Sequence, residues 1–378
     1  MKRCIPLLLI SCLLLCGCAD RQVEEELLVI VLAIDQADSG KVSVAVKVPA
    51  NSSAAGGGSG GQEQDQAGYM QLEATGQSFS DAVSMLNATT PRQLNFSQVR
   101  EIVIGEAAAK QPDFGPLLQQ IDALPRFRCS AAVIICRGSA LSFSEKQKPY
   151  VGMRLSRYAE NTLANYAGKG FTPSTDLCSG VRDLGCGFRD PLFILGAVND
   201  FSASQAPGEN NSLSAQAGFL PRKSAEPVET FGAAATDGVC VSGCLTGYEM
   251  ALIHLLQGHV EALSIQQNGT ALHITSSFPA ALRVDLSARP AVLGLSLQCS
   301  AQYPPGYAPD EEALQNRLRE DLTGLLRHLQ ALRCDGIGFG DAAVRQFLTV
   351  QDWERLQWRR VYSEALVQVE VDVRCREM

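Results

Sequence analysis

The segment LVQVEVDVRC, residues 366–375, alternates strictly between apolar and polar side chains. Its valines at positions 367, 369, 371 and 373 would all lie on one face, and its polar residues would lie on the other. A period of two is typical of a half-buried strand, so the segment predicts an antiparallel strand with one face on a core. A strand buried inside a parallel sheet would read as a continuous apolar run, so the segment disfavours a doubly wound α/β fold.

A second alternating segment, Lys41–Val48, follows the compact apolar run Leu27–Ile34. We expect these two segments to pair as antiparallel strands, with the valines of the second on a half-buried face. Between the two ends of the chain, residues 311–332 form a long amphipathic pattern that predicts a helix capped by Asp310. Its apolar stripe, which we expect to face a core, contains Leu314, Leu318, Leu322, Leu325, Leu329 and Leu332.

Shorter patterns complete the predicted elements. Helices are expected over residues 76–86, where Ser78 can cap with Asp81 three residues later, and over 114–124, 153–167 and 248–256. Strands are expected over residues 99–104, 131–136, 272–276, 282–286 and 292–303. Because strands and helices mix without a regular βαβ alternation, the predicted class is α+β, with mixed or mainly antiparallel sheets and packed helices.

Composition changes along the chain predict its division into domains. Residues 51–68 are rich in Gly and Ser and predict a surface loop, and residues 199–217 are rich in Ser, Ala, Gly and Asn. We expect a signal peptide over 1–17, an N-terminal domain over 18–200, a middle domain over 201–289 and a C-terminal domain over 290–378.

Charge and motif content disfavour several functions. The net charge is −8 and the pI is near 5.2, so no nucleic-acid partner is expected, because phosphate binding relies on Lys and Arg. The four histidines form no H-E-x-x-H motif and no Cys/His zinc spacing, so neither a metal nor another cofactor is expected. No G-x-S-x-G motif is present and no acid pair stands out, so we expect no enzyme. The GIGFG segment at 336–340 fits a helix stop and turn better than a dinucleotide loop.

The first residues have the features of a secretory signal. A positive start, Met1–Arg3, precedes an apolar run, Ile5–Leu15, that is shorter than the roughly 20 residues needed to span a bilayer. Leu15, Cys16 and Gly17 then precede Cys18 in the order of a bacterial lipobox, which predicts diacylglycerol attachment to the Cys18 thiol. The alternative is an unmodified cysteine beside an ordinary cleavage site. Two acyl chains would form a stable membrane anchor.

Nine further cysteines follow Cys18, an odd number that leaves at least one unpaired within a monomer. Two close pairs, Cys178/Cys186 and Cys240/Cys244, are candidates for disulfides in an exported protein. Burial as small apolar residues is the competing interpretation, and the sequence favours it for most of the others.

Three blocks together resemble the Ger(x)C family of spore germination lipoproteins. The first block is CADRQVEEELLVIVLAID at 18–35. The second runs from Gly76 to Lys110 and contains the Pro91-Arg92 pair and the sequence VIGE. The third is the C-terminal tail, which contains DGIGFG, Trp353, Trp358, Tyr362 and the terminal alternating strand. A weaker block at 244–258 places Glu249 where the family usually has an acid. The order and spacing of these blocks carry the resemblance over almost the whole chain.

The resemblance implies three small α+β domains and a non-enzymatic subunit, anchored by lipid at Cys18 to the outer face of the spore inner membrane. It also implies two integral membrane partners, the A and B subunits of a nutrient germinant receptor, and makes residues 201–378 the family's C-terminal region. The chain departs from the family at Ala19, where a Trp is common, and at Tyr362-Ser363, where an aromatic-Pro pair is usual. A solute-binding lipoprotein of a membrane transporter is the alternative function. The two Trp residues are expected in the core, with a partner surface as the other option.

Overall fold

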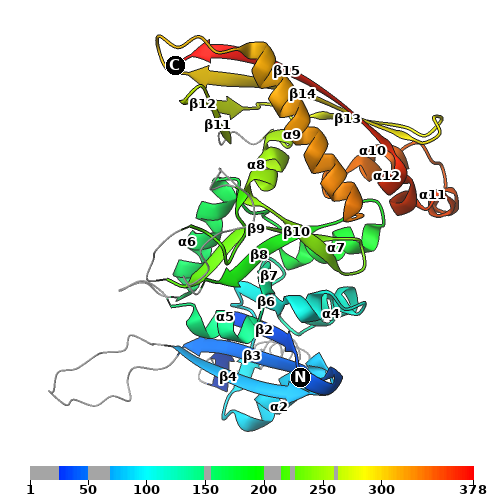
Figure 1. Ribbon diagram of the computed structural model, residues 1–378. Helices are drawn as coiled ribbons and strands as arrows, with labels where there is room; N and C mark the ends of the chain where they lie inside the picture. Colours follow the sequence, from blue (N-terminus) through cyan, green and yellow to red (C-terminus); the bar gives the residue numbers. More distant parts are fainter. Residues whose placement is uncertain (1–24, 50–68, 149–154, 200–213, 222–225, 259–262) are drawn as a thin grey trace, which may run out of the picture.

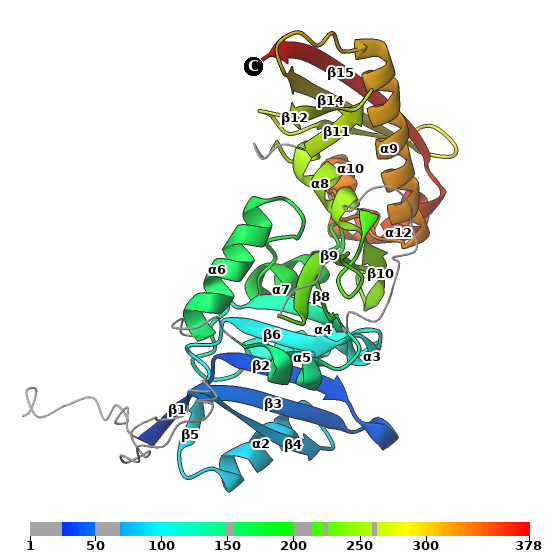
Figure 2. The ribbon, with the colours of Figure 1, turned by 60° about the vertical axis from the view of Figure 1, so that its left-hand side comes forward.

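The computed structural model describes residues 25–49, 69–148, 155–199, 214–221, 226–258 and 263–378. The predicted signal peptide, the lipobox residues Leu15, Cys16, Gly17 and Cys18, and the Gly/Ser-rich loop at 51–68 lie outside these residues. Two large sheets lie at different levels of an elongated molecule, and the C-terminal sheet lies at the far end from α2 (Figures 1 and 2).

The first sheet has eight strands in the order β10-β9-β8-β7-β6-β2-β3-β4. Its strands are β2 (Val31–Gln36), β3 (Val42–Pro49), β4 (Tyr69–Gly76), β6 (Glu101–Gly105), β7 (Ala132–Arg137), β8 (Leu192–Val198), β9 (Val228–Thr236) and β10 (Val241–Leu245). The central strands β2, β6, β7 and β8 are parallel, and the pairs toward both edges are antiparallel. The predicted antiparallel pairing of Lys41–Val48 with the preceding apolar run is confirmed. That run is divided between β2 and β1 (Glu26–Leu28), which pairs with β5 (Gln93–Asn95).

Both faces of this sheet are covered by helices. Strand β3 was expected to be half-buried, but every residue from Val44 to Val48 is buried. Its valines pack in one core with α2 (Phe79–Thr89), α4 (Phe114–Asp122) and the start of α7 (Leu177–Cys186). On the other face, Ala45 packs in a second core with α5 (Ala140–Lys146) and α6 (Leu155–Gly168). The alternation therefore reflects two different cores rather than a core and solvent.

The sheet continues across residue 200, where a domain boundary was predicted. Strands β9 and β10 lie beyond that position, yet β9 pairs with β8 along most of its length and β10 pairs with β9. The division of the chain into three domains stays a prediction. The α+β class is confirmed, because mixed sheets with packed helices occur in both halves of the chain.

The second sheet is built around β14 (Val292–Tyr303), whose bounds match the predicted strand. It also contains β11 (Leu263–Gln267), β12 (Thr270–Thr275), β13 (Ala281–Asp285) and β15 (Leu366–Glu377). The predicted antiparallel orientation of the last strand is wrong: β15 runs parallel to β14 over twelve residue pairs. Alternation distinguishes the two faces of a strand and does not give its direction, and the helices between β14 and β15 provide the long crossover that parallel pairing requires. Val371 and Val373 do face the core, as expected.

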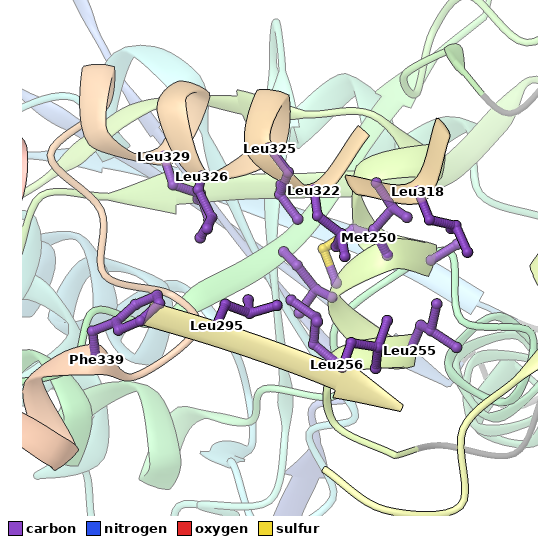
Figure 3. Close-up of a cluster of buried hydrophobic side chains, with 14 of the residues drawn as sticks. Met250, Leu255, Leu256, Leu295, Leu318, Leu322, Leu325, Leu326, Leu329 and Phe339 are labelled. Carbon is purple, nitrogen blue, oxygen red and sulfur yellow. The ribbon is translucent and has the colours of Figure 1, made fainter. Parts of the chain in front are cut away.

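The helix α9 (Glu311–Ala331) covers one face of this sheet. The Asp310 side chain accepts a hydrogen bond from the Ala313 amide, as its predicted capping role requires. The leucine stripe of α9 packs against β14 and against α8 (Gly247–Leu256), and Figure 3 shows these side chains meeting Met250, Leu255, Leu256 and Leu295. Leu332, the last residue of the predicted stripe, is only partly buried. Four short helices complete the described structure: α3 (Glu106–Ala109), α10 (Phe339–Val344), α11 (Val350–Leu356) and α12 (Trp358–Glu364).

Candidate functional site at the junction of the two sheets

A buried carboxylate organises the glycine-rich turn between α9 and α10. Asp335 is 1% exposed, and its side chain accepts hydrogen bonds from the amides of the next turn and from an indole. The donors are Gly338 N at 3.0 Å, Phe339 N at 2.9 Å, Gly340 N at 2.6 Å and Trp358 Nε1 at 3.0 Å. The prediction of a helix stop and turn is thus confirmed, and a carboxylate with four donors stabilises that turn.

The same turn is joined to the start of β8 in the first sheet. Asp335 N donates to Asp190 Oδ2 at 2.9 Å, and Asp190 N donates to the Asp335 carbonyl at 3.3 Å. Arg359 of α12 then donates through Nη2 to Asp190 Oδ1 at 2.8 Å. A further ion pair joins Arg189 to Asp341. Segments about 150 residues apart in the sequence therefore meet in one hydrogen-bonded junction.

Two glycines of the junction have no room for a side chain. A Cβ on Gly340 would lie 2.0 Å from the Phe188 carbonyl oxygen and 2.8 Å from Trp358 Nε1. Gly338 adopts a φ of +99°, a conformation that residues with a side chain rarely adopt. Gly340 is therefore needed for close approach to the segment before β8, and Gly338 for the backbone conformation of the turn.

Burial raises the pKa of both junction acids. It raises the pKa of Asp335 to about 6, against the opposing effect of the amide and indole hydrogen bonds. Burial also raises the pKa of Asp190, while the neighbouring Arg359 guanidinium acts in the opposite direction. The junction therefore holds two desolvated acids and one partly exposed cation, an arrangement that fixes two parts of the chain relative to each other.

A cavity of about 500 Å³ opens beside this junction. Its wall includes Ser179 from α7, Arg189 and Asp190 from the start of β8, and Met250 and His254 from α8. His254 is buried, and its Nε2 atom lies 3.0 Å from the Thr172 carbonyl oxygen. The cavity thus combines cationic, anionic, hydroxyl and apolar groups from both halves of the molecule, and its size suits a small polar molecule.

Glu249 and His328 link α8 to α9 close to the same region. Glu249 forms a capping box with Thr246, and its other carboxylate oxygen lies 2.5 Å from His328 Nδ1. Burial alone would raise the pKa of Glu249, but the hydrogen bonds with His328 and Thr246 together lower it. The same contact with Glu249 raises the pKa of His328. Glu249, which lies where the resembled family usually has an acid, therefore joins α8 to α9.

A second buried polar cluster lies inside the first sheet. Lys47 on β3 donates to the Gln147 carbonyl at 2.6 Å, and Gln147 Nε2 donates to Glu101 Oε2 on β6 at 2.7 Å. Burial lowers the pKa of Lys47 to about 8 and raises the pKa of Glu101 to about 7. These contacts join the C-terminal end of α5 to two strands, which accounts for charged residues at positions that a strand pattern would assign to the core.

The aromatic residues of the tail pack together behind the junction. Trp353 and Trp358 are buried, with ring centroids 5.8 Å apart, and Trp358 lies 5.8 Å from the Tyr362 ring. The core interpretation of both tryptophans is confirmed. Since the Trp358 indole also donates to Asp335, this aromatic group supports the junction from the C-terminal side.

The two close cysteine pairs predicted as candidate disulfides are not formed. All nine cysteines after Cys18 carry free thiols. Cys178 and Cys186 lie in the first and last turns of α7, about 12 Å apart along the helix axis, which no disulfide can span. Cys240 lies just before strand β10 and Cys244 within it, and both carry free thiols. Cys136, Cys299 and Cys334 are buried, as small apolar residues would be.

Sequence reasoning identified the turn, the aromatic residues and Glu249, but it missed Asp190, Asp335 and Arg359 as one group. The spacing of DGIGFG carried a signal, because an acid just before closely spaced glycines can accept hydrogen bonds from the amides of the turn. Nothing in the sequence indicated which cation or which distant strand would meet that acid. Within the described residues, no group of three or more His, Cys, Asp and Glu side chains is arranged to hold a metal, and no helix is long and apolar enough to cross a membrane.

Comparisons with known proteins agree along most of the chain. Residues 20–192 match the spore germination protein N-terminal domain, and residues 302–378 match the family described as spore germination B3/GerAC like, C-terminal. The chain is 22% identical over 372 residues to YfkR of Bacillus subtilis strain 168, a protein named for spore germination, and the match covers 97% of this chain and 94% of that protein. The crystal structure of the GerBC protein superposes with a TM-score of 0.50 at 13% identity, covering 91% of this chain and 96% of that one, which shows a shared fold. None of these matches is to a transporter component.

Proposed function

Because the chain belongs to the Ger(x)C family of spore germination proteins, we propose that it is the lipid-anchored C subunit of a spore nutrient germinant receptor. In this role it is a non-enzymatic scaffold on the outer face of the spore inner membrane. It acts with the integral membrane A and B subunits. The observation that carries the proposal is the match of residues 20–192 to the spore germination protein N-terminal domain and of residues 302–378 to the GerAC-like C-terminal domain.

The N-terminal boundary of that match supports the lipid anchor. The matched domain begins at residue 20, two residues after Cys18, so the predicted signal peptide lies entirely outside it. An acylated Cys18 would tether the domain directly beside the bilayer through two buried acyl chains. Leu15 and Gly17, at the two positions that the pattern restricts, would direct the modification, and Leu15, Cys16 and Gly17 would then be removed.

The junction supports a scaffold role. Asp335 and Asp190 are both occupied by donors from their own chain, so neither carboxylate is free to act as a general base. Their hydrogen bonds instead hold the two sheets in a fixed relation, which suits a subunit that presents surfaces to neighbouring proteins.

The test is complementation of a deletion strain in the spore-former that carries this gene. Wild type, Cys18→Ala and the matched control Cys16→Ala are each introduced, and nutrient-triggered germination, vegetative growth and the membrane share of the protein are measured. Wild type and Cys16→Ala should restore germination and sediment with membranes, whereas Cys18→Ala should be released and restore little. Affinity capture of the wild type from spore membranes should recover two polytopic proteins.

Two results would contradict the proposal at different points. Membrane retention of Cys18→Ala would refute the lipid anchor alone. A deletion that slows vegetative growth and leaves germination normal would refute the receptor role.

A further inference from the structure

Cys129 and Cys178 are the two exposed cysteines among the nine that the structure describes, and the fold brings them together. Cys129 precedes β7, and Cys178 lies in the first turn of α7. A short antiparallel contact joins these segments: Ala132 bridges to Asp176, Leu177 N donates to the Ala131 carbonyl at 2.9 Å, and Cys178 N donates to the Cys129 carbonyl at 3.0 Å.

This backbone contact sets the distance between the two cysteines. A hydrogen bond from one amide to the carbonyl of the other residue keeps the two α-carbons within about 7 Å, which is the upper limit for a disulfide. The two side chains also lie close enough for the Cys129 thiol to influence the titration of Cys178. That thiol contact is the main cause of the raised pKa of Cys178.

The position of α7 is itself well fixed. The Asp176 side chain caps the helix by accepting a hydrogen bond from Ser179 N at 2.8 Å, and the Ser179 hydroxyl accepts one from Asp176 N at 3.1 Å in a capping box. The approach of Cys178 to Cys129 therefore does not depend on a loose loop. By contrast, Cys186 lies at the far end of the same helix and cannot reach Cys129 while the helix is intact.

We propose that Cys129 and Cys178 form a reversible disulfide by exchange with a low-molecular-weight disulfide such as glutathione disulfide. One protein thiolate attacks a sulfur of the reagent, forms a mixed disulfide and releases one glutathione thiolate. The second protein thiolate then attacks the protein sulfur of that adduct, forms the Cys129–Cys178 bond and releases the second glutathione thiolate. Two protein thiols lose two protons and two electrons, and one glutathione disulfide is reduced to two glutathione molecules.

The bond would act on the walls of two cavities. Ser174 and Thr175, just before α7, line both the junction cavity and a second cavity of about 300 Å³ that also includes Arg128 and Ser130. A covalent link between residues 129 and 178 would hold these walls together, since Cys129 lies between Arg128 and Ser130 and Cys178 lies two residues after Asp176, all of which line the second cavity. The oxidation state of one exposed pair would thereby control the freedom of the segment that separates the cavities.

The test uses the full-length protein, solubilised from membranes and incubated natively with excess glutathione disulfide. Free thiols are then alkylated, and tryptic peptides are analysed without reduction. Oxidised wild type should yield peptide 129–137 linked to peptide 170–182, and fragmentation should place the bond at Cys129 and Cys178. Dithiothreitol should remove the linked species.

Variants distinguish the pair from general thiol oxidation. Cys129→Ser should abolish the linked peptide, and a stable glutathione adduct should accumulate at Cys178. In wild type, the second protein thiolate displaces glutathione from this adduct. Cys186→Ser, on the same helix, should leave the linked peptide unchanged. Separate glutathione adducts on both cysteines in wild type, a bond from Cys136 instead of Cys129, or a link that forms only after denaturation would each overturn the proposal.

Discussion

At the scale of single residues, Asp335 shows how a buried charge can specify a turn. Its carboxylate is almost inaccessible to water, yet four donors surround it, and these donors come from the turn that follows and from an aromatic residue more than twenty positions away. An unpaired charge in this position would be strongly unfavourable, whereas a charge that accepts several hydrogen bonds fixes the backbone that supplies them. The turn therefore depends on the acid as much as on its glycines.

We expect Asp335→Asn to lower the free energy of unfolding by about 2–4 kcal/mol. The new side-chain amide would point its N–H groups at the backbone and indole N–H donors that now bind the carboxylate. Those buried donors would then lack an acceptor. The matched control is Asp341→Asn, which breaks the partly exposed ion pair with Arg189 and should cost less than about 1 kcal/mol. Denaturant unfolding of both variants measures the difference, and equal effects would contradict the assigned role of Asp335.

At the scale of elements, α8 and α9 pack through leucines and are joined at one polar point. Figure 3 shows the apolar contact, and the contact between Glu249 and His328 lies outside this leucine cluster. Glu249 also caps α8, so one side chain both starts a helix and holds its neighbour. Because a histidine takes part, the link between these helices depends on pH.

The effect of pH on this link follows from the direction of the two pKa shifts. The raised pKa of His328 means that its stabilisation is complete below the ordinary histidine value of about 6.5 and is lost as the pH rises through the folded-state value. The lowered pKa of Glu249 means that its stabilisation is present above about 4.3 and is lost as the pH falls further. The pair should therefore contribute most between about pH 5 and pH 6.

Comparison of wild type with His328→Gln tests this pH dependence. The difference in unfolding free energy should be larger at pH 5.5 than at pH 8.5, by less than about 1 kcal/mol because His328 is partly exposed. In a Glu249→Gln background, the same histidine substitution should show no such change with pH. A difference that is independent of pH in wild type would show that the ion pair makes no contribution.

At the scale of the whole molecule, the junction determines how the two sheets are placed. Asp190 and Phe188 lie just before β8, while Asp335 lies in the turn after α9, Gly340 in α10 and Arg359 in α12. Figures 1 and 2 show that β15, the last strand, lies in the sheet farthest from α2. These contacts therefore hold the C-terminal sheet in place at one end of the long axis of the molecule. A scaffold with surfaces along that axis would depend on them.

Gly340→Ala should weaken this placement. The added Cβ would lie 2.0 Å from a backbone oxygen of the first sheet, so either the turn or Phe188 must move. We expect a loss of at least 2 kcal/mol, on the order of other overpacking changes, and faster proteolysis between the sheets. Gly324→Ala is the matched control, because this exposed position of α9 has open space and alanine should stabilise the helix by roughly 1 kcal/mol. Equal stability of the two variants would argue against close packing at Gly340.

The sequence by itself determined the elements whose signals are local. The caps at Ser78 and Asp310, the leucine stripe of α9, the inward valines of β15 and the bounds of β14 all follow from side-chain spacing along a single segment. Helix and strand periodicities depend on neighbours within a few residues, which is why these predictions are confirmed. The glycine turn of the site was predicted from its local spacing as well.

Only the tertiary structure decided the rest. The direction of β15, the burial of both faces of β3, the continuity of the sheet across residue 200 and the absence of the two close disulfides all depend on which distant segments meet. The site at the junction belongs to the same class, since Asp190, Asp335 and Arg359 are brought together by folding across about 150 residues. Alternation distinguishes the two faces of a strand, but it does not say whether each face meets a core or solvent, or in which direction the neighbouring strand runs.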